Sequence, residues 1–241
     1  MHTKRRPWRP QLTRAEMGRG WVFFALYLTV FPLSMGWVQR AFHGELPVAE
    51  ANVVYYLLAA TLVFLVFWTF LRHGFDLLLD WVLLRQEKDR SDRYLFAFGT
   101  GLVGAGVLHL LVMLIPLPVQ NPNPESYAQQ FALSPAATVV ILVVLMPLVE
   151  EPLFRGLLFG ATRRYSRVLG YVLSTLVFAL YCVWQFVYTY GTVDFRYLLL
   201  FLQYVPMSLA LTWCYDNGGS IWSPIALHMV LNALILASAV L

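Results

Sequence analysis

The sequence predicts an all-α fold, a polytopic bundle of about seven transmembrane helices, and three observations lead there. Hydrophobic residues make up 59% of the 241 residues and charged residues only 12%, whereas soluble domains carry about 25% charged residues. Several apolar runs are long enough to cross a bilayer as helices, with a mean hydropathy of +0.64 for the whole chain. The charged residues gather in short basic clusters between these runs, which is the pattern that orients membrane proteins.

The composition also excludes other classes of protein. The net charge of +4 comes from the clusters between apolar runs, so we expect the lipid bilayer as a partner and no nucleic acid. The two cysteines, Cys182 and Cys214, both lie in apolar segments, which does not indicate a disulfide framework. The first apolar run has no small-residue cleavage site after it and is predicted to be a span rather than a signal peptide.

Residues 1–19 hold six basic residues against the single acid Glu16 and are predicted to form a basic cytoplasmic arm. Residues 20–241 are predicted to form a single membrane domain. Its first two spans are expected at 21–38 and 53–71, followed by a basic cytoplasmic loop over 72–93. Within that loop, residues 75–84 are amphipathic and are expected to lie along the membrane interface. A third span, 94–115, carries four glycines that permit close helix packing.

The second half continues the alternation. Residues 116–134 are rich in proline and contain no Lys or Arg, so an extended external loop is predicted. Ser134 and Pro135 form a helix start, and the fourth span runs to about Thr162, before a basic cluster. The remaining spans are expected at 168–188, 197–214 and 221–240. We expect an integral, multi-pass protein of the bacterial inner (cell) membrane, with the N-terminus in the cytoplasm and the C-terminus outside.

Three ionisable residues interrupt the fourth span: Glu150, Glu151 and Arg155. Ionisable groups inside a membrane helix are costly and indicate a functional site. Residues i and i+4 share a helix face, so Glu151 and Arg155 can pair and leave Glu150 free to act as a general base or acid. Pro147 and Pro152 each remove a backbone donor from this helix.

The last span carries His228 and Asn232, again four residues apart on one face. Two hydrogen-bond donors one turn apart can hold a developing oxyanion. His228 can alternatively ligate a metal, or the pair can simply join helices. At 1.5 Å per residue, Glu150 lies about 20 Å from the cytoplasmic end of its helix and His228 about 10–12 Å, so both can reach one cavity.

These residues resemble the CPBP (Abi, CAAX protease and bacteriocin-processing) family of intramembrane proteases. The likeness is carried by Glu150-Glu151-x-x-x-Arg155, by His228-x-x-x-Asn232, and by the run from Gly219 that precedes His228. It covers about residues 134–240, with residues 134–241 as the CPBP-like catalytic core. The first three spans contribute nothing diagnostic.

The resemblance implies an endopeptidase that cleaves a membrane-anchored or lipid-proximal protein or peptide near its C-terminus. It implies that Glu150 activates a water molecule, supported by Glu151 and Arg155. His228 and Asn232 are then oxyanion donors or metal ligands. No cofactor is assigned, and a divalent metal such as zinc remains open.

One position departs from the family pattern. The middle motif F-x-x-x-H corresponds to the stretch from Phe178 to Cys182, so a cysteine stands where the family has histidine. Cys182 can replace it as a ligand or as the nucleophile of a C-terminal sorting protease or transpeptidase. It can also be inert, with Glu150 sufficient and Tyr181 or Gln185 assisting. The chain can also be a non-catalytic relative that binds a membrane partner, or a proton-coupled transporter. Cys214 is expected to be a packing residue.

Overall fold

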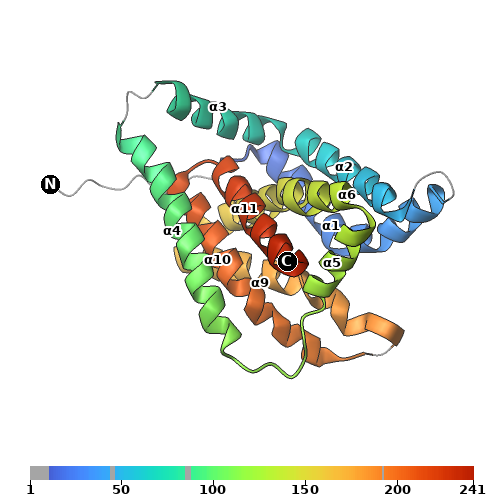
Figure 1. Ribbon diagram of the computed structural model, residues 1–241. Helices are drawn as coiled ribbons and strands as arrows, with labels where there is room; N and C mark the ends of the chain where they lie inside the picture. The colour runs from blue at the N-terminus through green and yellow to red at the C-terminus, as the bar shows by residue number, and fades with distance from the viewer. Residues whose placement is uncertain (1–10, 44–46, 85–87, 192) are drawn as a thin grey trace.

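The computed structural model describes residues 11–43, 47–84, 88–191 and 193–241 (Figure 1). These residues form helices and no strand, which confirms the predicted all-α membrane bundle. Within them, six helices are long and apolar enough to cross a membrane. They are Val48–Val66, Tyr94–Met113, Pro135–Arg163, Arg167–Tyr188, Phe195–Gly218 and Trp222–Val240. The first predicted span, 21–38, lies in α1 (Arg14–Ala41), a helix of 28 residues, and its crossing of the membrane remains a prediction.

The second span lies five residues earlier in the chain than predicted. α2 (Val48–Val66) ends five residues early, and α3 (Trp68–Leu84) begins almost at once, so the predicted segment 75–84 belongs to a longer helix. The buried carboxylate of Glu16 explains this break. It closes the capping box of α1 with Thr13 and also accepts a 2.9 Å hydrogen bond from the backbone N–H of Phe70, in the first turn of α3. Glu16 therefore caps two helices.

α4 (Lys88–Met113) begins within the predicted basic loop. The next segment corrects the prediction of an extended loop over 116–134, because residues 123–133 form α5 (Asn123–Leu133). Proline suited a loop in the sequence, but Pro124 lies in the first turn of α5, where its missing N–H has no helical partner to lose. Among the elements that α5 packs against is α11 (Trp222–Val240).

The fourth span is the centre of the bundle. Two thirds of its most apolar window is buried (67%), against 17–39% in the other five candidate spans. It is one continuous rod with two π-helical stretches, whose wider turns leave each N–H bonded to the fifth residue back. Its segments are α6 (Pro135–Val139), η1 (Val140–Leu145), α7 (Met146–Glu151), η2 (Pro152–Phe159) and α8 (Gly160–Arg163).

The last third of the chain closes the bundle around this rod. After α9 (Arg167–Tyr181), the tight helices η3 (Trp184–Gly191) and η4 (Phe195–Leu200) lead into α10 (Phe201–Gly218). α10 thus runs four residues beyond the predicted end of the sixth span. It ends at Gly219, whose φ of 81° lies in the left-handed region that favours glycine.

The basic clusters meet at one end of the bundle, which we call the inner end. There Asp216 pairs with Arg163 at 3.0 Å and with Arg167 at 2.8 Å, joining α8, α9 and α10. Ser220 and Trp222 donate hydrogen bonds to the carbonyls of Gly74 and Leu71, which holds α3 at the same end. The opposite, outer end carries α5, and Figure 1 shows α3 and α5 well separated.

Candidate active site

Four ionisable side chains meet midway along the central rod. Glu150, Glu151, Arg155 and His228 are each at most 2% exposed. Buried charges are tolerated when they are paired and hydrogen-bonded. The structure therefore brings together the three charges of the fourth span and the histidine of the last one.

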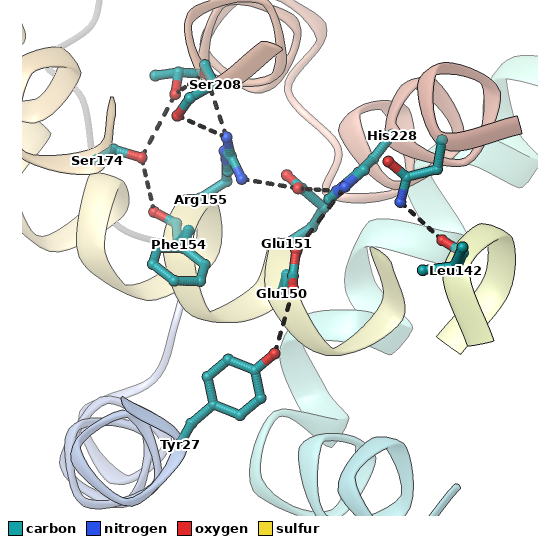
Figure 2. Close-up of polar contacts among 11 residues, drawn as sticks. Tyr27, Leu142, Glu150, Glu151, Phe154, Arg155, Ser174, Ser208 and His228 are labelled. Carbon is teal, nitrogen blue, oxygen red and sulfur yellow. Dashed lines mark hydrogen bonds and ion pairs between the residues drawn. The ribbon is translucent and has the colours of Figure 1, made fainter. Parts of the chain in front are cut away.

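Glu151 is the hub of this cluster (Figure 2). Its Oε1 accepts a hydrogen bond from Arg155 Nη1 at 2.8 Å and lies 2.7 Å from His228 Nδ1. The predicted pairing of Glu151 with Arg155 is thus present. A proton on His228 Nδ1 suits this contact, because a carboxylate accepts hydrogen bonds, and it leaves Nε2 to face the other carboxylate.

Arg155 is held on two further sides. Its Nη2 donates to the hydroxyl of Ser208 at 3.0 Å and to the Ser208 carbonyl at 3.3 Å. Its guanidinium lies 4.3 Å from the centre of the Phe178 ring. The same ring meets His228 edge-on at 5.9 Å between centroids. Sequence reasoning missed Ser208, whose only signal is a small polar residue within an apolar span.

Glu150 lies between α1 and α11. Its Oε1 accepts a long hydrogen bond of 3.4 Å from the hydroxyl of Tyr27, and its Oε2 is 3.9 Å from His228 Nε2. That second distance is too long for a direct hydrogen bond, and a water molecule can contact both atoms. Tyr27 was also missed, because nothing in the sequence distinguishes it from other tyrosines of the apolar runs.

Asn232 does not contact the carboxylates. Its Nδ2 donates to the carbonyl of Leu142 at 2.7 Å. In η1 the N–H of Met146 bonds to Ile141, so the donor for Leu142 in the same pattern would be Pro147, which has no N–H. Asn232 therefore satisfies a carbonyl that a proline leaves free, and one of its two amide hydrogens remains for another acceptor.

Replacing Asn232 with leucine is expected to destabilise the protein by about 1–3 kcal/mol, because the Leu142 carbonyl loses its donor in a partly buried place. Thermal unfolding of the purified protein in detergent measures this. Ser238→Ala is the matched control, since the exposed Ser238 on the same helix bonds only to Ile235 of its own turn. Equal melting temperatures for the two variants would show that the hydrogen bond from Asn232 to Leu142 does not stabilise the protein.

Cys182 lies at the end of α9 and is half-buried. It is within electrostatic range of Glu150 and Arg155. Among the described residues, no hydrogen bond joins its Sγ to His228, whose two nitrogens both face carboxylates. The ring of Tyr181 lies tilted against that of Tyr27, with ring centres 5.1 Å apart.

Cys214 is fully buried in a small apolar cluster with Leu211 and Leu227. Across the described part of the chain, no group of three or more His, Cys, Asp or Glu side chains is placed to hold a metal ion. His228 Nδ1 lies against Glu151 and its Nε2 faces Glu150 at 3.9 Å, so the carboxylates and the imidazole can themselves accept and donate the protons of a hydrolysis.

Comparison with known proteins adds one finding. Residues 132–234 match the model of a family described as type II CAAX prenyl endopeptidase Rce1-like. The matched region contains the four ionisable side chains of the cluster, and Tyr27, which bonds to Glu150, lies outside it. Searches of curated proteins and of solved structures found no match. The predicted resemblance is confirmed, and the chain is an integral, multi-pass membrane protein related to membrane proteases.

Proposed function

We propose that this chain, which over residues 132–234 belongs to the Rce1-like family of membrane proteases, is an active intramembrane endopeptidase. Its substrate is a membrane-anchored or lipid-proximal protein or peptide, cut near its C-terminus by a water molecule that Glu150 activates. The observation that carries this proposal is the facing pair of Glu150 Oε2 and His228 Nε2, 3.9 Å apart in a buried site.

Charge balance supports these roles. Glu150 and Glu151 bring two negative charges into the cluster, and Arg155 brings one positive charge. A protonated His228 makes the cluster neutral, which a site far from bulk water favours. In that state Glu150 is ionised and can accept a proton, while both imidazole nitrogens carry hydrogen.

The reaction then follows in two steps. A water molecule between Glu150 and His228 gives a proton to Glu150 Oε2 while its oxygen bonds to the scissile carbonyl carbon. The resulting oxyanion accepts hydrogen bonds from His228 Nε2 and from the free amide hydrogen of Asn232. Collapse of this intermediate breaks the C–N bond, and Glu150 passes its proton to the leaving amine. Tyr27 keeps Glu150 oriented through its hydroxyl.

Cys182 is a bystander in this mechanism, because among the described residues no hydrogen bond joins its thiol to His228, whose two nitrogens face Glu150 and Glu151. Cys182→Ala is expected to keep processing within about threefold of the unchanged protein, whereas a thiol nucleophile would make the variant inactive. The rate of substrate processing at equal protein levels measures this. Loss of processing in Cys182→Ala with normal folding would support the sorting protease or transpeptidase instead.

The proposed activity is tested by comparing the C-termini of membrane proteins in cells that lack the gene and carry one of three replacements. The unchanged gene should restore processing, and Glu150→Gln should behave like no gene. Asp76→Asn, which changes an exposed carboxylate on α3, should restore processing fully. Normal processing by Glu150→Gln would refute the mechanism and favour the non-catalytic relative or the transporter.

We also propose that the protein lies in a bacterial inner (cell) membrane with its N-terminus in the cytoplasm. The basic clusters at the inner end support this orientation.

A further inference from the structure

A cavity of about 490 Å³ opens at the outer end of the bundle. Its walls come from α1, α2, α5, η1, α7, η3 and η4. On α1, α2 and the central rod, the lining residues lie toward the end remote from the basic clusters. Asn52 lies in the first turns of α2, and Gln185 lies in η3, beyond the end of α9.

The cavity leads toward the proposed base. Leu142 and Met146 line it, and Glu150 follows at the same spacing of four residues, one turn deeper in the rod. Tyr56 and Tyr127 also line the cavity, and both interact electrostatically with Glu150. The cavity and the cluster are therefore neighbouring parts of one site.

The lining mixes polar and apolar side chains. Amide and hydroxyl groups provide its hydrogen-bonding capacity, and no Asp, Glu, Lys or Arg is among the described residues that form it. Burial raises the pKa of the Tyr127 phenol well above its ordinary value, so this hydroxyl stays neutral. Neutral donors and acceptors suit a peptide backbone with uncharged side chains, whereas a charged side chain would be left without a partner here.

The wall that α5 forms is fastened at both ends. At its start, Asn121 donates to Gln203 at 2.9 Å, and Asn123, the first residue of α5, donates to the hydroxyl of Tyr204; both acceptors are on α10. After α5, the hydroxyl of Ser134 donates to Glu50 on α2 at 3.1 Å. The cavity is thus pre-formed, which lowers the cost of binding an extended segment.

We propose that this cavity admits the substrate from the outer side of the membrane, as an extended segment without charged residues next to its membrane anchor. This assignment rests on the proposed protease activity and specifies its substrate class. The occupant is the extracytoplasmic juxtamembrane part of a membrane-anchored protein. A segment in the cytoplasm would have to reach Glu150 past α3 and the Asp216 ion pairs at the inner end.

The side of access can be tested without a substrate. Ser126→Cys places a thiol in the cavity wall, and Arg164→Cys places one at the exposed inner end. A membrane-impermeant trimethylammonium methanethiosulfonate should label Ser126→Cys in right-side-out vesicles and Arg164→Cys only in inside-out vesicles, with the unchanged protein as background. Labelling of Ser126→Cys only in inside-out vesicles would overturn the proposal.

The substrate class is tested by a matched pair on α5. Both Gln129 and Gln130 are exposed, but Gln130 lines the cavity and Gln129 lies outside it. Gln130→Lys should reduce processing about tenfold, mainly through KM, because an ammonium is placed against a neutral segment. Gln129→Lys should leave processing unchanged. Gln185→Lys, on another wall, should repeat the loss. Equal processing by Gln130→Lys and Gln129→Lys would show that the segment does not use this cavity.

The positions of the cut sites separate this inference from the activity itself. The proteins whose C-termini depend on Glu150 should be cut outside the membrane or at its outer face, in an uncharged stretch. Cytoplasmic cut sites that depend on Glu150 would overturn the outer-side assignment and leave the protease standing. Termini that do not depend on Glu150 at all would overturn both.

Discussion

Arg155→Met is expected to lower the free energy of unfolding by about 3–5 kcal/mol, the cost of leaving a buried ion-pair partner uncompensated. Arg155 is fully buried and bonds to Glu151 and Ser208 while lying over Phe178. Methionine fills much of the volume but gives the Glu151 carboxylate no charge. Thermal unfolding of the purified protein in detergent measures the loss.

Arg167→Met is the control for this effect. The side chain of Arg167 is 43% exposed and pairs with Asp216 at the inner end, and exposed ion pairs contribute about 0–1 kcal/mol. Glu151→Gln combined with Arg155→Met removes both charges and should recover part of the stability. If Arg155→Met and Arg167→Met lowered the melting temperature equally, the buried pair of Arg155 and Glu151 would contribute no more to stability than the exposed pair of Arg167 and Asp216.

Glu151→Gln is expected to slow processing about 10–100-fold, by analogy with the loss found when a carboxylate that orients a metal-bound histidine is removed. The amide oxygen can still accept from Arg155 and His228. It carries no negative charge, however, so it no longer favours the protonated His228 that the mechanism uses. Because Glu151 positions His228 without touching the substrate, the loss should fall on kcat, with KM little changed.

The assay for Glu151→Gln is a substrate titration with the purified variant in lipid nanodiscs. Ser174→Ala is a suitable control, because the buried Ser174 bonds to the Phe154 carbonyl at 3.1 Å and reaches Arg155 only indirectly, through Thr212 and Ser208. A rise in KM with unchanged kcat would mean that Glu151 acts in substrate binding and not in orienting His228.

The parts of the site that follow from local spacing could be predicted from the sequence. Glu151 and Arg155 are one turn apart, and their pairing needs no knowledge of the fold. The motif from Glu150 to Arg155, the His228-x-x-x-Asn232 motif and the run from Gly219 together indicated the family. The all-α membrane fold followed from hydropathy and the basic clusters.

Contacts between distant helices could not be predicted in this way. Tyr27 is 123 residues from Glu150, and Ser208 is 53 residues from Arg155. The early end of α2 also depends on a distant residue, because Glu16 caps the start of α3. Such contacts are fixed by packing, which leaves no periodic signal in the sequence.

Proline was the residue most easily misread. Four prolines in 116–134 indicated a loop, yet one of them begins α5. Pro147 and Pro152 indicated an interrupted helix, and the structure keeps the rod continuous with two π-helical stretches. Asn232 shows how this is achieved, since its amide replaces a missing backbone donor. Because one amide hydrogen of Asn232 is bonded to Leu142, only the other one can donate to the proposed oxyanion.

The most direct test of the central claim is the cleavage rate of purified protein in nanodiscs with one identified substrate, comparing the unchanged chain, Glu150→Gln and Cys182→Ala. If Glu150 is the general base acting on water, the cleavage rate of Glu150→Gln should be about 10²–10⁴-fold lower than that of the unchanged chain, with the same melting temperature. The cleavage rate of Cys182→Ala should stay near that of the unchanged chain. A folded Glu150→Gln variant that cleaves at the original rate, or a folded Cys182→Ala variant that does not cleave, would contradict it.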